Sequence, residues 1–257
     1  MKVLMLGGCH TYAYGSENIS KGYYQQFLRF LNLNGYEIEE ISYAPISVRG
    51  VNRLFNQKNI IPNDYDLIIL QLGNYEFDSS ISNFHKLFTS EKKKNSIEGG
   101  EFNQPLNEQL ITKRRSWIKN EKIDTPTKSL LKRKFSSLLS VSARIFRFFS
   151  ELPKIRIEKQ YIEDLFDALQ IVSDKVIFIG VFPSTYGLRQ YIRSVGNSYI
   201  KNKCENVGIS YLELIDINDP SIWIHDGAHF NEGGHEIILD RLLRLCGEKF
   251  QLKKLNM

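Results

Sequence analysis

Cysteine is scarce in this chain of 257 residues, which contains only Cys9, Cys204 and Cys246. The three are far apart and odd in number, so they form no CxxC pair, no zinc-ligand spacing and no disulfide framework. Small disulfide-stabilised domains, whose cysteines are dense, are therefore excluded. This pattern favours a reduced, cytoplasmic setting.

Long apolar runs are also missing. The N-terminal sequence MKVLMLGG has one lysine and a short apolar stretch, whereas a secretory signal needs a longer apolar core and a cleavage site. A membrane-spanning helix needs about 20 apolar residues. We therefore expect neither, and we interpret residues 2–7 as the first buried strand of the fold.

An excess of positive charge is confined to one segment of the chain. Residues 113–159 contain 14 Lys and Arg against 4 Asp and Glu, a balance of +10 within a chain of net charge +5, so the rest carries −5. Such a segment can meet an anionic ligand or surface, although a solvated helical face is the commoner meaning.

Within this segment, residues 128–151 predict a basic amphipathic helix. Its apolar side chains recur at helical spacing: Leu131, Phe135, Leu138, Ile145 and Phe149. We expect this stripe to cap the sheet edge or to meet a second copy of the chain, and a peripheral contact with an anionic membrane is the alternative. Nucleic acid is not an expected partner, because the sequence holds no nucleic-acid-binding motif.

What the sequence does contain is a series of buried strands. They are predicted at residues 2–7, 36–43, 66–73, 175–182 and 209–215, with a helix before Gly35 and a last helix over 232–245. Strands separated by helical stretches indicate a parallel sheet with helices on both faces. We therefore predict one three-layer α/β/α domain over residues 1–257, with a five-stranded parallel sheet. The long interval at about residues 78–155 is predicted to be a helical insertion.

Polar and reactive residues follow these strands. In an open parallel sheet, ligands bind beyond the carboxyl ends of the strands. The segments there contain a thiol, backbone amides, a carboxamide and an Asp-His pair, which are the parts of an acyl-transfer site. The candidate residues are Cys9, His10, Arg49, Gly50, Asn74, Glu76, His225, Asp226 and His229.

The chemistry of these residue types suggests their roles. Cys9 is predicted to be the nucleophile, His229 its general base, and Asp226 the group that orients the imidazole. A cysteine at a turn before a helix also gains from the positive field of the helix N-terminus. The oxyanion would be held by the backbone N–H groups of Cys9 and Gly50 and by Asn74.

The remaining candidates are assigned to the rim of the site. His10, Arg49, Glu76 and His225 are predicted substrate contacts. His225 and His229 are four residues apart, which could place a metal pair on a helix, but the intervening Asp-Gly indicates a loop and we expect no metal. His235, further along, is predicted to pack or cap at the last helix.

The closing segment DGAHFNEGGH, residues 226–235, resembles the last block of the SGNH, or GDSL, hydrolase family of esterases and acyltransferases. That block is a DxxH motif followed by Gly-His and a helix. Gly50, within SVRGVN, is similar to the glycine of the family's second block. The order of blocks also agrees, so the resemblance covers the chain except for about residues 78–155. It implies a flavodoxin-like fold and ester hydrolysis or acyl transfer.

Two blocks depart from the family pattern. The first reads GGC where the family has GDS, so Cys9 stands at the nucleophile position and Gly8 replaces an aspartate. In the third, Asn74 follows Gly73 directly, whereas the family has Gly-x-Asn-Asp.

A cysteine in the first block also resembles a smaller set of capsule-polysaccharide biosynthesis enzymes that carry Gly-Asn-Cys-Gln there. This resemblance implies acetyl transfer to a carbohydrate, with acetyl-CoA as a candidate donor, whereas hydrolysis requires no cofactor. A non-catalytic sugar-binding or assembly module that keeps the fold is the alternative.

Overall fold

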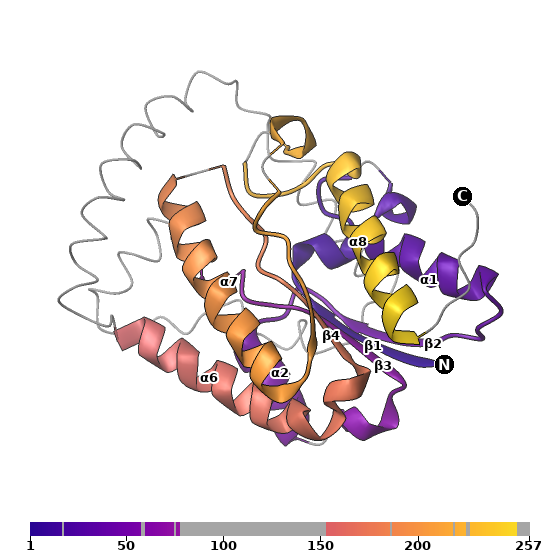
Figure 1. The fold of residues 1–257 in the computed structure, drawn as a ribbon, viewed down its shortest axis with the longest axis horizontal. Coiled ribbons are helices and arrows are strands. Elements are labelled where there is room, and N and C mark those ends of the chain that lie inside the picture. The colour runs from indigo at the N-terminus through magenta and orange to yellow at the C-terminus, as the bar shows by residue number, and fades with distance from the viewer. Residues whose placement is uncertain are drawn as a thin grey trace.

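A computed structural model describes residues 1–16, 18–57, 60–74, 76–77, 153–185, 187–217, 219–224 and 227–250 (Figure 1). The predicted insertion over residues 78–155 lies outside the described residues, apart from its last three, which begin a helix. The predicted amphipathic helix over 128–151 lies wholly outside them. His225 and Asp226 lie outside them as well.

The described residues form a five-stranded parallel sheet in the order β2-β1-β3-β4-β5. Its strands are β1 (Lys2–Gly7), β2 (Glu39–Tyr43), β3 (Leu67–Gln71), β4 (Val176–Ile179) and β5 (Ser210–Leu212). This strand order is the flavodoxin-like one. It confirms the predicted fold class and all five predicted strands.

The second strand starts later than the predicted residue 36. Lys2, the first residue of β1, pairs with Glu39, the first residue of β2. Before this pair, the N-terminal nitrogen of Met1 donates to the Glu37 carbonyl oxygen at 2.7 Å, and the Glu39 N–H donates to the Met1 carbonyl oxygen at 3.0 Å. Tyr36 and Ile38 are partly buried and pack against the hydrophobic core on the side of α1 and α8.

Helices cover both faces of the sheet (Figure 1). One face holds α1 (Tyr23–Leu33) and α8 (Glu232–Phe250), and the other holds α2 (Val48–Asn56), α6 (Pro153–Leu169) and α7 (Gly187–Val207). Among the described residues, no helix is both long enough and apolar enough to cross a membrane.

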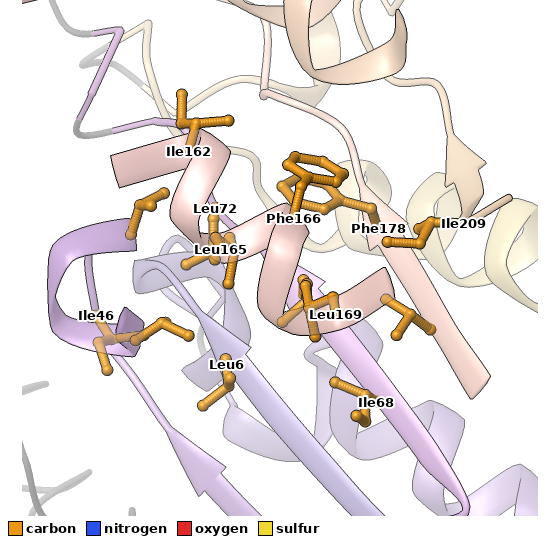
Figure 2. Close-up of a cluster of buried hydrophobic side chains, with 14 of the residues drawn as sticks. Leu6, Ile46, Ile68, Leu72, Ile162, Leu165, Phe166, Leu169, Phe178 and Ile209 are labelled. Atoms are coloured by element: carbon orange, nitrogen blue, oxygen red, sulfur yellow. The ribbon is translucent and has the colours of Figure 1, made fainter. Parts of the chain in front are cut away.

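The two faces follow from the alternation of side chains along each strand. In β1, Val3 and Met5 belong to the hydrophobic core on the side of α1 and α8, while Leu4 and Leu6 belong to the opposite core. Figure 2 shows this second core, in which residues of α6 pack over the strands. Its labelled members include Phe166 and Leu169 of α6 together with Leu6, Ile68 and Phe178 of the strands. The rings of Phe166 and Phe178 stack with centroids 5.8 Å apart. Both faces are buried, as the continuous apolar runs predict.

Helix α2 begins within the segment SVRGVN, residues 47–52, which contains Gly50. Ser47 caps this helix, because its side-chain oxygen accepts a hydrogen bond from the Gly50 N–H. The last helix, predicted to end at residue 245, extends to Phe250.

Candidate active site

The first strand delivers Cys9 to the carboxyl edge of the sheet. Gly7 ends β1, and the Gly8 N–H donates to both the backbone oxygen and the side-chain oxygen of Gln71, at 3.0 and 2.8 Å. Cys9 then opens a single turn of 3₁₀ helix, η1 (Cys9–Tyr12). This arrangement anchors the residue before Cys9 to the neighbouring strand β3.

The α-helix whose N-terminal field was expected to act on Cys9 begins further along the chain than the turn that contains this residue. The turn η1 ends at Ala13, which adopts a left-handed conformation with φ 61°, and α1 begins only at Tyr23. A positive φ on a non-glycine residue stops a helix, because the right-handed backbone cannot continue through it. A full α-helix therefore does not begin at Cys9.

His229 is held on a hairpin that precedes α8. Trp223 and Phe230 form an isolated antiparallel bridge at its base. The carbonyl of Gly227 accepts a hydrogen bond from the Thr185 N–H at 2.9 Å, which joins the hairpin to the loop after β4. His229 is thus fixed from two sides at the same sheet edge as Cys9.

The structure brings the predicted nucleophile and base together. Cys9 Sγ lies 2.9 Å from His229 Nε2, within the distance expected for a nucleophile and its base. Cys9 is partly exposed, whereas Cys204 and Cys246 are buried. Burial raises the pKa of the Cys204 thiol well above its ordinary value, so this second thiol is unreactive at neutral pH. The role of Asp226 stays a prediction, because that residue lies outside the described ones.

His10 is buried beside this pair, with only 1% of its surface exposed. Its ring stacks on Phe182 with centroids 3.9 Å apart, and its Nδ1 lies 3.9 Å from Cys9 Sγ. The Phe230 N–H donates to His10 Nε2 at 3.3 Å. Burial, and then the neighbouring His229, hold the pKa of His10 well below its usual range. The ring is therefore neutral at neutral pH.

Cys9, His10 and His229 each offer one ligand atom, and these atoms lie within 4.8 Å of one another. A thiolate and two imidazoles are a zinc-like donor set. The His10 ring is neutral and its Nε2 accepts a hydrogen bond from the Phe230 N–H, so the proton of this ring is on Nδ1. The Nδ1 atom then has no lone pair for a cation. As arranged, the cluster fits a hydrogen-bonded thiol better than a metal ion.

Gly50, the predicted oxyanion donor of the second block, lies in the first turn of α2. Its N–H donates to the Ser47 side-chain oxygen at 3.2 Å. An oxyanion role requires this capping bond to be exchanged for one to the substrate. The position still demands glycine, because a Cβ atom there would lie 2.7 Å from Ile46 Cγ1.

Asn74 is buried after β3, and its Oδ1 accepts a hydrogen bond from the Phe182 N–H at 2.9 Å. This bond fixes the orientation of the amide. The Nδ2 group is therefore the end that would donate to an oxyanion.

The predicted substrate contacts have different surroundings. Glu76 is buried, and its two carboxylate oxygens accept from the backbone N–H groups of Val48, at 2.7 Å, and Gly73, at 3.0 Å. Arg49 is placed over the ring of Tyr161, 5.6 Å from its centroid. His225 lies outside the described residues. Contact of these residues with substrate stays a prediction.

His235 is buried in α8 and bridges to the first loop of the fold. Its Nδ1 faces the Tyr23 N–H at 3.5 Å, and its Nε2 lies 3.1 Å from the Tyr14 carbonyl oxygen. These contacts agree with the packing role predicted for it.

Two residues beside the site were not singled out from the sequence. Gln71 is the polar residue at the end of the apolar strand β3, and it is fully buried. A polar side chain in a buried strand is a signal that could have found it. Phe182 contacts both His10 and Asn74, but an aromatic residue after an apolar strand gives no such signal.

The sheet order and the residues at its carboxyl edge define an SGNH hydrolase-like fold. The solved structures that share it include a protein of the G-D-S-L family from Desulfitobacterium hafniense DCB-2. It has a TM-score of 0.51 and 10% identity, over 95% of this chain and 98% of that one.

Two further solved structures match over nearly their whole length. TesA gives a TM-score of 0.54 at 12% identity, covering 97% of this chain and 99% of that one. Axe2, an acetyl xylan esterase from Geobacillus stearothermophilus, gives 0.55 at 11% identity, covering 100% and 97%. At these identities the likeness concerns the fold. No family model matches the sequence, and no curated protein matches it either.

Proposed function

We propose that this protein transfers acyl groups through a thioester on Cys9, with His229 as general base and general acid. The 2.9 Å contact between Cys9 Sγ and His229 Nε2 carries the proposal. The two residues are 220 positions apart, so only the fold places them in contact. Elsewhere in the described residues the cysteines are buried.

The structural neighbours support an ester substrate. Catalytic variants of the acetylxylan esterase Axe2 replace a serine in one case and a histidine in another, which are the residue types expected at the positions of Cys9 and His229. That enzyme supports an acetyl group and a carbohydrate as the first candidates here.

The reaction proceeds in two balanced steps. In the first, His229 takes the Cys9 proton, the sulfur bonds to the carbonyl carbon of the donor, and the leaving group departs with a proton from His229. In the second, His229 takes the proton of water or of a sugar hydroxyl, whose oxygen attacks the thioester. The Cys9 sulfur then leaves and regains its proton. Asp226 orients the imidazole, and the N–H groups of Cys9 and Gly50, together with Asn74, hold the oxyanion in both steps.

The thiol at position 9 favours a thioester donor over an oxygen ester. A thiolate that attacks an oxygen ester forms an intermediate from which the thiolate is the better leaving group, so the reaction tends to reverse. With a thioester donor, both groups that can leave the intermediate are thiolates, the donor's and that of Cys9, so the intermediate can break down in the forward direction. We therefore propose O-acyl transfer from a thioester as the main activity, with ester hydrolysis as its side reaction.

The initial rates at which CoA is released from acetyl-CoA and p-nitrophenolate from p-nitrophenyl acetate test this proposal. Cys9→Ala and His229→Ala are expected to lower both rates at least about a thousandfold. Cys204→Ala serves as the matched control, because it removes a thiol outside the site, and it is expected to retain the parent rates. Parent-like turnover in Cys9→Ala would overturn the proposal and favour a module without catalysis at this site.

A further inference from the structure

We propose that His10 is a second hydrogen-bond donor to the Cys9 sulfur and thereby stabilises the thiolate beside His229. The inference rests on the proposed function in so far as Cys9 is the nucleophile. His10 is a positioning residue here, since it acts on the substrate only through Cys9.

The direction of the hydrogen bonds around the His10 ring carries the inference. A neutral imidazole has one N–H donor and one acceptor nitrogen. The Phe230 N–H points at Nε2 from 3.3 Å, so Nε2 is the acceptor and Nδ1 holds the proton. The Nδ1 atom lies 3.9 Å from Cys9 Sγ, within reach of a large sulfur acceptor. This distance shortens when the sulfur carries a negative charge, because charge-assisted hydrogen bonds are shorter.

The surroundings of His10 keep it a neutral donor throughout the reaction. The ring is enclosed by Phe182 and Phe230, with centroids 3.9 and 5.7 Å away. Burial holds the pKa of His10 low, and so do the charged forms of its neighbours His229, His235 and Arg193. When His229 takes the Cys9 proton, His10 therefore adds no second positive charge that would oppose the imidazolium.

Three titratable side chains act on the sulfur: Tyr23, His10 and His229. Tyr23 is electrostatically coupled to Cys9, but burial raises the pKa of its phenol well above the usual value, so it stays neutral. His10 and His229 both contact the sulfur, and their rings lie 5.0 Å apart. Two donors on one thiolate are an arrangement that lowers the free energy of its charged form.

His10 also connects the two catalytic segments. Its own backbone belongs to η1, directly after Cys9. Its Nε2 binds the backbone of Phe230, directly after His229. A single ring thus sets both the donor at the sulfur and the position of the hairpin that holds the base.

Two amide substitutions separate these contributions. In His10→Asn the side-chain amide lies near the position of Nδ1, which retains a donor towards Cys9 and loses the acceptor for Phe230. In His10→Gln the amide lies near the position of Nε2, which retains that acceptor and loses the donor. The two variants are therefore matched controls for each other.

The readout is the rate of Cys9 alkylation by iodoacetamide as a function of pH, followed by intact mass. In His10→Gln the midpoint of this profile is expected to rise by about one pH unit, so alkylation below the midpoint slows about tenfold. His10→Asn is expected to keep the parent midpoint within a few tenths of a unit. Equal midpoints in both variants, whether unchanged or shifted together, would overturn the inference.

A measurement on the parent protein covers the case in which a variant does not fold. NMR of the histidine ring nitrogens and carbons distinguishes the two neutral tautomers, and His10 is expected to be the Nδ1–H form at neutral pH. An Nε2–H form would overturn the inference. Neither measurement needs turnover, so an absent acyl-enzyme would overturn the proposed function and leave these results interpretable.

Discussion

The side-chain oxygen Oε1 of Gln71 lies 2.8 Å from the backbone nitrogen of Gly8. Gln71 is fully buried, and a Cβ atom on Gly8 would lie 2.8 Å from the same oxygen. The Gln71 amide therefore fills the space that a side chain at position 8 would need. The glycine before Cys9 and the polar residue in the apolar strand β3 therefore depend on each other.

The first prediction concerns this pair. Gly8→Ala is expected to lower the free energy of unfolding by about 1–3 kcal/mol, because the new methyl group displaces the Gln71 amide. In the Gln71→Ala background the same change is expected to cost less, since the obstructing oxygen is absent. Urea unfolding of the four proteins measures the coupling. An equal cost in both backgrounds would show that the two positions do not interact.

The second prediction concerns Glu76, which joins the loop after β3 to the start of α2. Glu76→Ala is expected to lower the free energy of unfolding by about 2–4 kcal/mol, because two buried N–H groups lose their acceptor. Glu76→Gln is expected to lower the free energy of unfolding by less than Glu76→Ala, because the glutamine amide keeps one acceptor oxygen. Some loss remains, because its NH₂ group faces the other backbone N–H. Urea unfolding checks this order.

Asp240→Asn is the matched control for Glu76. Asp240 forms an exposed i,i+4 ion pair with Arg244 at 2.8 Å, and such pairs contribute about 0.3–0.5 kcal/mol. If Glu76→Ala costs no more than Asp240→Asn, the two hydrogen bonds of Glu76 do not hold these segments.

The third prediction is a pH dependence of stability that comes from His10. Its folded pKa lies below the unfolded value, so above about pH 6.5 both states are neutral and His10 has no effect. Below about pH 6.5 the unfolded chain binds a proton that the folded protein does not, and stability falls by at most about 1.4 kcal/mol per pH unit. The loss ends near the folded pKa.

Urea unfolding at about pH 7.5 and about pH 5.5 measures this loss, and the reference is His10→Gln, which has no imidazole to titrate. Arg241 holds the pKa of Asp216 below its usual range, so that carboxylate loses its contribution only at lower pH, below about pH 4. If the parent and His10→Gln lose equal stability over the upper interval, His10 is not the source.

Much of the fold and the contact between Cys9 and His229 could be predicted from the sequence. Continuous apolar runs identify the strands, and both residues follow strands whose carboxyl ends share one edge. The orientation of His10 could not be predicted, because it depends on the N–H of Phe230, which is 220 positions away. The distance between Cys9 and α1 could not be predicted either, since nothing in the residue type of Ala13 signals a left-handed backbone.

The measurement that tests the account most directly is the trapping of an acyl-enzyme. The protein is mixed with p-nitrophenyl acetate, quenched with acid within the first turnover, and analysed by intact mass and peptide mapping. The variant His229→Ala is included because the acyl-enzyme should accumulate in it. Acylation of Cys9 is slower without His229, but it still occurs, since the p-nitrophenolate leaving group needs no proton. Hydrolysis of the thioester, the second step, still needs a base that the variant lacks.

One acetyl group per chain is expected on the peptide that contains Cys9, in the parent or in His229→Ala, and none at this position in Cys9→Ala. Cys204→Ala is expected to label like the parent. Acetyl groups on another residue at equal occupancy in Cys9→Ala, or the absence of label from both the parent and His229→Ala, would contradict the assignment of Cys9 as the nucleophile.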